Sequence, residues 1–128
     1  TRPIPQARHR HRNGGACTYD PCSAKKQEFL RQALQACAPP PVADRAKPFR
    51  CSLEFCFARP KSHYLKSGRL RKGARALATG RPDVDNLIKF VFDALNGVYF
   101  VDDAQCVHVA ASKAYAERDK VRVSMVFL

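Results

Sequence analysis

The chain lacks any apolar run of the roughly 18 residues that a membrane-spanning helix requires. Its first five residues also lack the apolar core of a secretory signal peptide. The single methionine is Met125, so the initiator was either removed or belongs to an upstream segment. These absences exclude a helical membrane protein and predict a soluble, non-secreted one.

Acidic residues are also scarce. The 128 residues hold 11 Asp plus Glu against 23 Lys plus Arg, which gives a formal net charge of +12. A strongly basic surface attracts polyanions, so nucleic acid is the leading partner class, although net charge can also serve solubility alone. The length is typical of one domain, and we expect a single domain over 1–128.

The six cysteines form an even set, but we expect them to be free rather than paired in disulfides. Cys37, Cys51, Cys56 and Cys106 lie in apolar segments, where a free cysteine behaves as a small hydrophobic residue. A second interpretation is a zinc site formed by Cys17 and Cys22 with His9 and His11, which are the right ligand types. The spacing of these four residues is atypical of such sites.

The hydrophobic periodicity predicts two helices and several strands. Helical stripes cover 23–37 and 85–95, the first stopped by three prolines at 39–41 and the second by Asn96 and Gly97. Alternating or apolar patterns predict strands over 49–59, 106–113 and 121–128, the last two joined as a terminal hairpin. Residues 97–101 are expected to be extended. The sequence thus predicts a small α/β (α+β) fold with a mixed sheet and two main helices.

Two segments are rich in basic residues. Residues 1–22 are expected to form an extended arm, and 59–81 a flexible, glycine-punctuated loop that orders on binding a polyanion. The alternative is a solvated linker. The candidate DNA-binding residues in these segments are Arg8, Arg10, Arg12, Lys66, Arg69, Arg71, Lys72, Arg75 and Arg81.

Five of the 11 acidic side chains fall between positions 83 and 103, although the chain is otherwise basic. Clustered carboxylates raise one another's pKa unless a cation neutralises them, and Mg²⁺ prefers oxygen ligands. Asp83 and Asp85 lie at a predicted helix start, where Asp85 is the expected N-cap, and Asp103 follows an extended segment. We therefore predict that Asp83, Asp85 and Asp103 bind a divalent metal. Asp102 is a weaker candidate, because adjacent residues on an extended segment point to opposite sides.

Lys89 lies one helical turn after Asp85. In one interpretation its ammonium stabilises charge that develops on a phosphate. In the other it forms an i,i+4 ion pair worth a few tenths of a kcal/mol. Asp93 is expected to be a surface or structural partner of Lys89 rather than a metal ligand.

The longer pattern is specific. Arg-Pro-Asp-Val-Asp-Asn-Leu-Ile-Lys at 81–89, Asp-Ala-Leu-Asn-Gly at 93–97 and Asp-Asp-Ala-Gln at 102–105 closely resemble the RusA family of Holliday junction resolvases. The early proline and arginine segment at 3–10, Tyr19 and Lys113 also resemble that family. The chain departs from the family in starting almost at this segment, where members usually begin with a short strand, and in its long basic insertion at 59–81.

The resemblance implies a homodimeric α/β endonuclease that uses Mg²⁺ or Mn²⁺ to nick opposing strands of a four-way DNA junction, inside the cell and associated with DNA. The catalytic positions of the family match Asp83, Asp85, Asp103 and Lys89. Two alternatives remain open: a non-catalytic DNA- or RNA-binding module, and a nuclease with a broader choice of flaps or forks.

Overall fold

In the computed structural model, which describes residues 3, 10–11, 18–19 and 23–128, the elements follow the order expected from the sequence. The helices are α1 (Ser23–Ala36) and α2 (Val84–Leu95), and the main strands are β3 (Phe49–Ala58), β4 (Cys106–Ala116) and β5 (Lys120–Phe127). Two short strands, β1 (Arg10–His11) and β2 (Thr18–Tyr19), pair antiparallel. Short 3-10 helices cover Val42–Asp44 (η1), Lys61–His63 (η2) and Asp103–Gln105 (η3).

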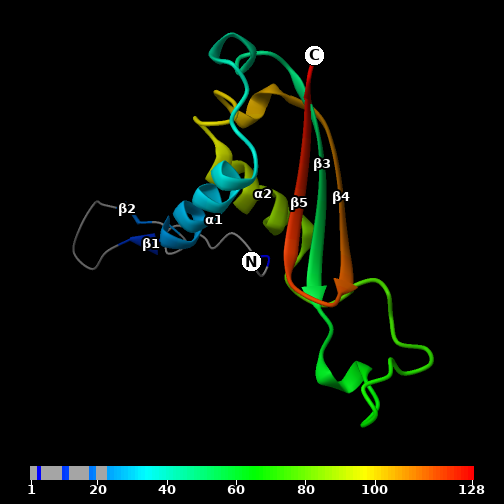
Figure 1. Cartoon of the computed structure of the whole chain (residues 1–128). Helices are drawn as coiled ribbons and strands as arrows, with labels where there is room; N and C mark the ends of the chain where they lie inside the picture. The colour runs from blue at the N-terminus through cyan, green and yellow to red at the C-terminus, as the bar shows by residue number, and fades with distance from the viewer. Residues whose placement is uncertain (1–2, 4–9, 12–17, 20–22) are drawn as a thin grey trace.

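The sheet is mixed and has the order β4-β3-β5. Strand β3 pairs parallel with β4 and antiparallel with β5. The predicted terminal hairpin is therefore wrong: β4 and β5 are consecutive in the chain, but β3 lies between them (Figure 1). The alternation of buried and exposed residues along β3 explains this, because a strand with one fully buried apolar face is favoured at the centre of the sheet. The expected α+β class, with two helices on a mixed sheet, is confirmed.

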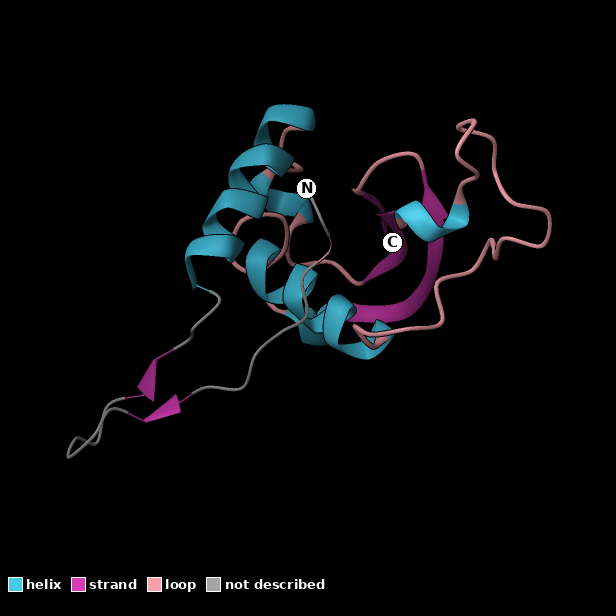
Figure 2. Ribbon diagram, turned by 90° about the horizontal axis from the view of Figure 1, so that it is seen from below, coloured by secondary structure: helices cyan, strands magenta, loops and turns pink. Residues whose placement is uncertain are grey.

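One face of β3 forms the floor of the core. Cys51, Leu53 and Phe55 on this face are each at most 2% exposed. Helix α2 covers them with its own buried residues, and α1 packs beside α2 on the same side of the sheet (Figure 2). The rings of Phe29 on α1 and Phe90 on α2 meet edge to face, with centroids 5.9 Å apart. Both helices are thereby fixed to one face of the sheet.

The link between α2 and η3 is a tight reversal rather than the extended segment that the sequence predicted. Gly97 has φ +81°, and its N–H donates to the carbonyl of Phe100 at 2.8 Å. A positive φ of this kind is readily adopted only by glycine, which is why Asn96-Gly97 ends the helix as expected. The reversal brings Phe100 back under Phe49, with ring centroids 4.9 Å apart.

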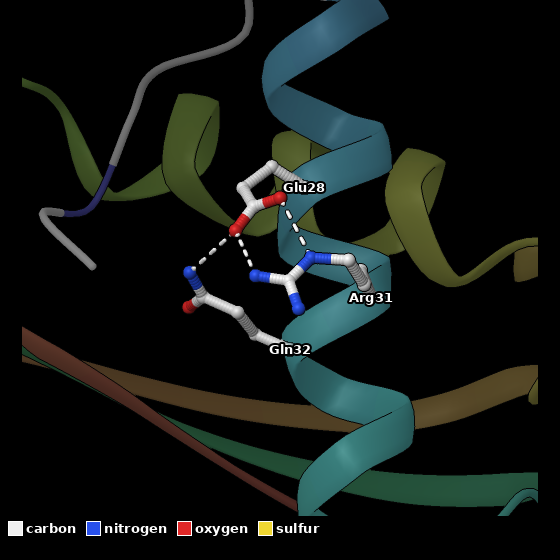
Figure 3. Close-up of polar contacts among 3 residues, drawn as sticks. All are labelled: Glu28, Arg31 and Gln32. Atoms are coloured by element: carbon white, nitrogen blue, oxygen red, sulfur yellow. Dashed lines mark hydrogen bonds and ion pairs between the residues drawn. The ribbon is translucent and has the colours of Figure 1, made fainter.

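Helix α1 carries its polar residues away from the core, and it ends at Ala36, one residue before the predicted end. On this face Arg31 and Gln32 both donate hydrogen bonds to the carboxylate of Glu28 (Figure 3). These bonds, that of Arg31 first, lower the pKa of Glu28 to about 2. Glu28 is thus committed to a local cluster, and it is not a free carboxylate for a metal.

Two further findings concern the cysteines and the membrane. Cys37, Cys51, Cys56 and Cys106 are free, as expected. The residues of the zinc alternative, Cys17 and Cys22 with the side chains of His9 and His11, lie outside what the structure describes. No helix in the described part of the chain is long and apolar enough to cross a bilayer.

The contact between α2 and the sheet can be tested by a pair of Leu→Ala substitutions. Leu87, on α2, is 0% exposed, whereas Leu70, in the loop after β3, is 46% exposed. We expect Leu87→Ala to lower the free energy of unfolding by about 2–5 kcal/mol, and Leu70→Ala to change it by less than about 0.5 kcal/mol. Urea unfolding measures both. Equal small effects would contradict the packing of α2 described here.

Candidate active site

Asp83 and Asp85 lie together at the amino end of α2. The N-cap is Asp83 and not Asp85, which corrects the sequence prediction, because the helical backbone already begins at Val84. An N-cap aspartate usually accepts a hydrogen bond from the helix backbone, yet the Asp83 side chain makes no such bond. Both side chains are exposed, and no ion pair joins either one to another residue of 23–128. Their carboxylates are available to an external ligand.

Lys89 follows on the same exposed face of α2. Within residues 23–128 it forms no ion pair with Asp85 or Asp93, so the interpretation as an i,i+4 pair gains no support. The expected pairing of Asp93 with Lys89 is wrong. Asp93 contacts Lys26 of α1 instead, with Nζ and Oδ2 3.4 Å apart. The packing of α1 against α2 brings Lys26 to Asp93, a contact that no local spacing could reveal.

Asp102 has a structural task at the start of η3. Its side chain accepts a hydrogen bond from the N–H of Ala104, and its own N–H donates to Oε1 of Gln105 at 2.7 Å. The Gln105 amide then donates to the carbonyls of Arg45 and Lys47 at 2.6 and 2.8 Å. This reciprocal cap, a capping box, attaches the turn to the segment before β3.

Asp103, in the first turn of η3, is surrounded by other carboxylates. A hydrogen bond with Asp102 is the largest cause that raises its pKa, followed by burial and by the negative charges of Asp102 and Asp93. A hydrogen bond from the Ala104 backbone opposes the rise. The charges of Asp83 and Asp85 are not among these causes. Electrostatically, Asp103 therefore belongs to the carboxyl end of α2, with Asp93.

The two acidic groups lie toward opposite ends of one helix. Twelve helical residues span about 18 Å at 1.5 Å per residue. Among the described residues, no group of three or more His, Cys, Asp or Glu side chains is arranged to hold a metal ion. A single chain therefore brings Asp83 and Asp85 to one place but does not bring Asp103 to the same site. Two carboxylates still fit Mg²⁺, which is often held by one or two carboxylates plus substrate phosphates.

The basic loop at 59–81 extends beyond the end of the sheet (Figure 1). It has local structure, because Tyr64 bridges to Leu70 and a tight turn places Gly68 at φ +86°. Four of the candidate DNA-binding side chains in the loop are exposed and form no side-chain hydrogen bond or ion pair within residues 23–128, namely Lys66, Arg69, Lys72 and Arg81. These four can meet phosphates without breaking an internal contact. The flexibility of the loop stays a prediction.

The remaining candidate DNA-binding residues differ in what holds them. Arg71 donates to the carbonyl of Ser62 at 2.9 Å, and Arg75 donates to the hydroxyl of Thr79 at 3.2 Å. Both therefore also help to shape the loop. Arg10 is described only through the backbone pairing of β1, and Arg8 and Arg12 lie outside the described residues.

A cluster at the base of the loop was not found from the sequence. Arg59 donates to the carbonyl of Arg75 at 2.8 Å, and its guanidinium lies over the ring of Tyr115, 5.9 Å from the centroid. The His63 ring meets Tyr115 edge to face at 4.8 Å. These residues come from the loop and from β4, so no sequence spacing could have linked them.

A groove of about 500 Å³ lies between α1 and the inner face of β5. Its lining is mainly apolar and includes Phe29, Ala33, Tyr99, Val123 and Met125. None of the predicted catalytic or DNA-binding residues lines it. Phosphate chemistry is therefore expected at the exposed carboxylates and not in this groove.

Comparison with known proteins adds two findings. The sequence profile of the Endodeoxyribonuclease RusA family matches residues 1–126. The chain is also 34% identical over 127 residues to the uncharacterized protein YqaN of Bacillus subtilis (strain 168), with 94% of this chain and 87% of the relative covered. Both matches extend over nearly the whole chain, so they include the basic segments as well as the acidic motifs.

In the absence of metal, Asp→Asn substitutions at the two ends of α2 should change the stability of the protein in opposite directions. Asp103→Asn should raise the free energy of unfolding, by up to about 0.5 kcal/mol, because it removes repulsion from Asp102 and Asp93. Asp85→Asn should lower it by about 0.3–1 kcal/mol, because a negative charge is favourable near a helix amino end. Chemical unfolding in EDTA at neutral pH measures both.

The raised pKa of Asp103 also predicts how the effect of Asp103→Asn depends on pH. Above the raised pKa, Asp103 is charged in the folded protein and is repelled by its neighbours. Below the ordinary value of 3.8, Asp103 is protonated in both the folded and the unfolded state, so the repulsion no longer affects stability. The gain in unfolding free energy from Asp103→Asn should therefore disappear as the pH falls from above the raised pKa of Asp103 to below 3.8. A loss of stability in Asp103→Asn at neutral pH would contradict the repulsion.

Proposed function

This chain belongs to the endodeoxyribonuclease RusA family, and we propose that it is a metal-dependent endonuclease that resolves four-way DNA junctions by paired symmetric nicks, in recombination and repair. The observation that carries the proposal is the pair of exposed carboxylates at the start of α2. Asp83 lacks the capping bond its position would allow, and Asp85 has no ion pair to residues 23–128. A helix cap alone does not explain two such carboxylates in a chain of charge +12.

The proposed cofactor is Mg²⁺, for which Mn²⁺ can substitute. Asp83 and Asp85 would hold it, because carboxylate oxygens are the ligands that hard divalent cations prefer. The bound ion would supply activation of a water and neutralisation of charge on the leaving oxygen. The helix amino end behind these carboxylates carries a partial positive charge, which favours a phosphate nearby.

Lys89 is proposed to bind the scissile phosphate. It lies one turn along α2 from Asp85, is exposed, and has no ion pair to residues 23–128 that would hold it away. An ammonium at this place stabilises negative charge that develops on a phosphate in the transition state. Its position on a helix whose opposite face is buried limits how far it can move.

We propose that the active unit is a homodimer in which Asp103 of the partner subunit joins Asp83 and Asp85. One observation and one requirement of the reaction support this. Asp103 lies with Asp93 near the other end of α2, away from Asp83 and Asp85 of its own chain, and the hydrogen bond with Asp102, burial and the negative charges of Asp102 and Asp93 raise its pKa. Two-fold symmetry would also give two equivalent sites, as paired nicks in a roughly two-fold junction require.

The junction arms are proposed to lie on the basic loop. Its exposed residues Lys66, Arg69, Lys72 and Arg81 neutralise phosphates, and the arm residues Arg8, Arg10 and Arg12 are assigned the same role. Release of counterions from DNA makes such binding weaken steeply with salt. The loop leads directly into Asp83 through Arg81 and Pro82, so bound phosphates would lie next to the carboxylates.

The first test is cleavage by Asp85→Asn. The amide keeps the shape but removes a ligand charge, so we expect junction binding within about twofold of the parent and a loss of cleavage of 100-fold or more, on the order of one catalytic electrostatic contact. The assay uses a labelled immobile four-way junction and a matched linear duplex, with Mg²⁺ or with EDTA. Glu117→Gln, at an exposed carboxylate of the β4-β5 turn, is the matched control and should cut normally.

The outcomes separate the alternatives. Paired nicks only on the junction, only with metal and only with Asp85 intact, would support the resolvase. Tight binding without cleavage by the parent would favour a non-catalytic binding module. Cleavage of flaps and forks at similar rates would favour a broader nuclease.

Mixed dimers test the shared site. When Asp85→Asn and Asp103→Asn protomers are mixed and allowed to exchange, a mixed dimer with shared sites has one site with both defects and one site with none. We expect the mixture to regain single nicks but not paired ones. If each site lies within one chain, both sites of the mixed dimer stay defective. Absence of nicking after verified subunit exchange would rule out the shared site.

A further inference from the structure

Lys113 is a charged residue on the core side of the sheet. It lies beside Phe55 in the parallel pairing of β3 and β4, and Phe55 is 1% exposed. Its neighbours on the same face of β4 are Ala111 and Tyr115. Lys113 itself is partly buried, and a charge that is withdrawn from water is costly unless its ammonium reaches a partner.

The ammonium of Lys113 reaches the backbone just before α2. Its Nζ donates to the carbonyl of Gly80 at 2.6 Å and to the carbonyl of Pro82 at 2.7 Å. The backbone of Lys113 also takes part, because its carbonyl accepts from the N–H of Ala78 at 3.4 Å. One residue of β4 thus binds three positions of the segment that leads into Asp83.

The segment 80–82 has few other means of being held. Pro82 has no N–H to donate, Gly80 has no side chain, and the Asp83 side chain makes no capping bond to α2. Within residues 23–128 no carboxylate forms an ion pair with Lys113. The charge of Lys113 is therefore directed at the two carbonyls, and those carbonyls fix the chain one residue before the first proposed ligand.

We propose that Lys113 is a positioning residue for strand cleavage, which sets the place of Asp83 and Asp85 by holding the carbonyls of Gly80 and Pro82. The inference rests on the proposed function of those carboxylates. Hydrogen bonds from a charged donor are stronger than those between neutral groups, and the two bonds from Lys113 select one position of the segment. A misplacement of about 1 Å at a reacting centre can cost on the order of 100-fold in rate.

The test compares Lys113→Met, which keeps most of the side-chain length without donors, with Lys113→Arg, which keeps charge and donors. Lys120→Met, on the exposed side of β5, is the matched control. Single-turnover cleavage of the junction is measured at saturating protein, normalised to binding-competent protein. We expect Lys113→Met to lower the cleavage rate by about 10–100-fold with junction Kd within about twofold. Lys113→Arg should recover most of the rate, and the control should match the parent.

A second readout does not need activity. Amide hydrogen exchange should become faster in Lys113→Met at Ala78, whose N–H donates to the carbonyl of Lys113, and at Leu87, whose N–H donates to the carbonyl of Asp83, while exchange in β3 stays unchanged. If the methionine variant does not fold, Lys113→Gln serves the same comparison with a smaller loss expected, because it keeps a neutral donor on a shorter side chain.

These readouts separate the two possible failures. If the parent cuts the junction, an unchanged cleavage rate in Lys113→Met, or unchanged exchange at Ala78 and Leu87, overturns the positioning role. A parent that cuts no branched DNA under Mg²⁺ or Mn²⁺ overturns the proposed function instead, and exchange then still reports whether Lys113 holds the segment. A general loss of protection throughout the sheet would show that Lys113 serves only the fold.

Discussion

The packing of α2 against β3 is the constraint on which the rest of the structure depends. Leu87, Val91 and Leu95 are at most 2% exposed, and together they fix how the helix is rotated about its axis. Because the helical period is 3.6 residues, this rotation places Asp85 and Lys89 on the stripe that faces solvent. A different rotation would bury these charges without partners, at a cost well above that of any surface contact. The hydrophobic core thus determines where the polar chemistry can occur.

The two acidic groups differ in what stabilises them. Asp83 and Asp85 lie where the α2 dipole favours negative charge, whereas Asp103 is repelled by Asp102 and Asp93. Asp83 and Asp85 can therefore be charged without a cation at little cost, whereas a bound cation would relieve the repulsion at Asp103. A site that combines ligands from both groups would be stable mainly when a divalent ion is present. Two metal-free protomers would then have an electrostatic reason not to close their carboxylates on one another.

Local sequence patterns predicted the helices and strands well, but they could not predict features that depend on contacts between distant segments. The alternation in β3 and the stripe of α2 are properties of consecutive residues, so their strand and helix were predicted within one or two residues. The place of β3 between β4 and β5 depends on pairing between distant segments, which periodicity does not encode. For the same reason the contact of Asp93 with Lys26 was missed. Lys113 did give a signal, a charge on the inward face of an apolar strand, but only the structure identifies its partners.

Strand β4 closes the basic loop at both ends. The N–H of Arg59 donates to the carbonyl of Ala116 at 3.1 Å where the loop begins, and Ala78 donates to Lys113 where it returns. A loop of this length has a modest closure cost once its ends are held, because that cost grows only with the logarithm of length. The sequence between the two anchors is therefore free to carry phosphate-binding side chains. Its return to β4 just before Asp83 would connect the proposed DNA binding to the carboxylates through one strand of the sheet.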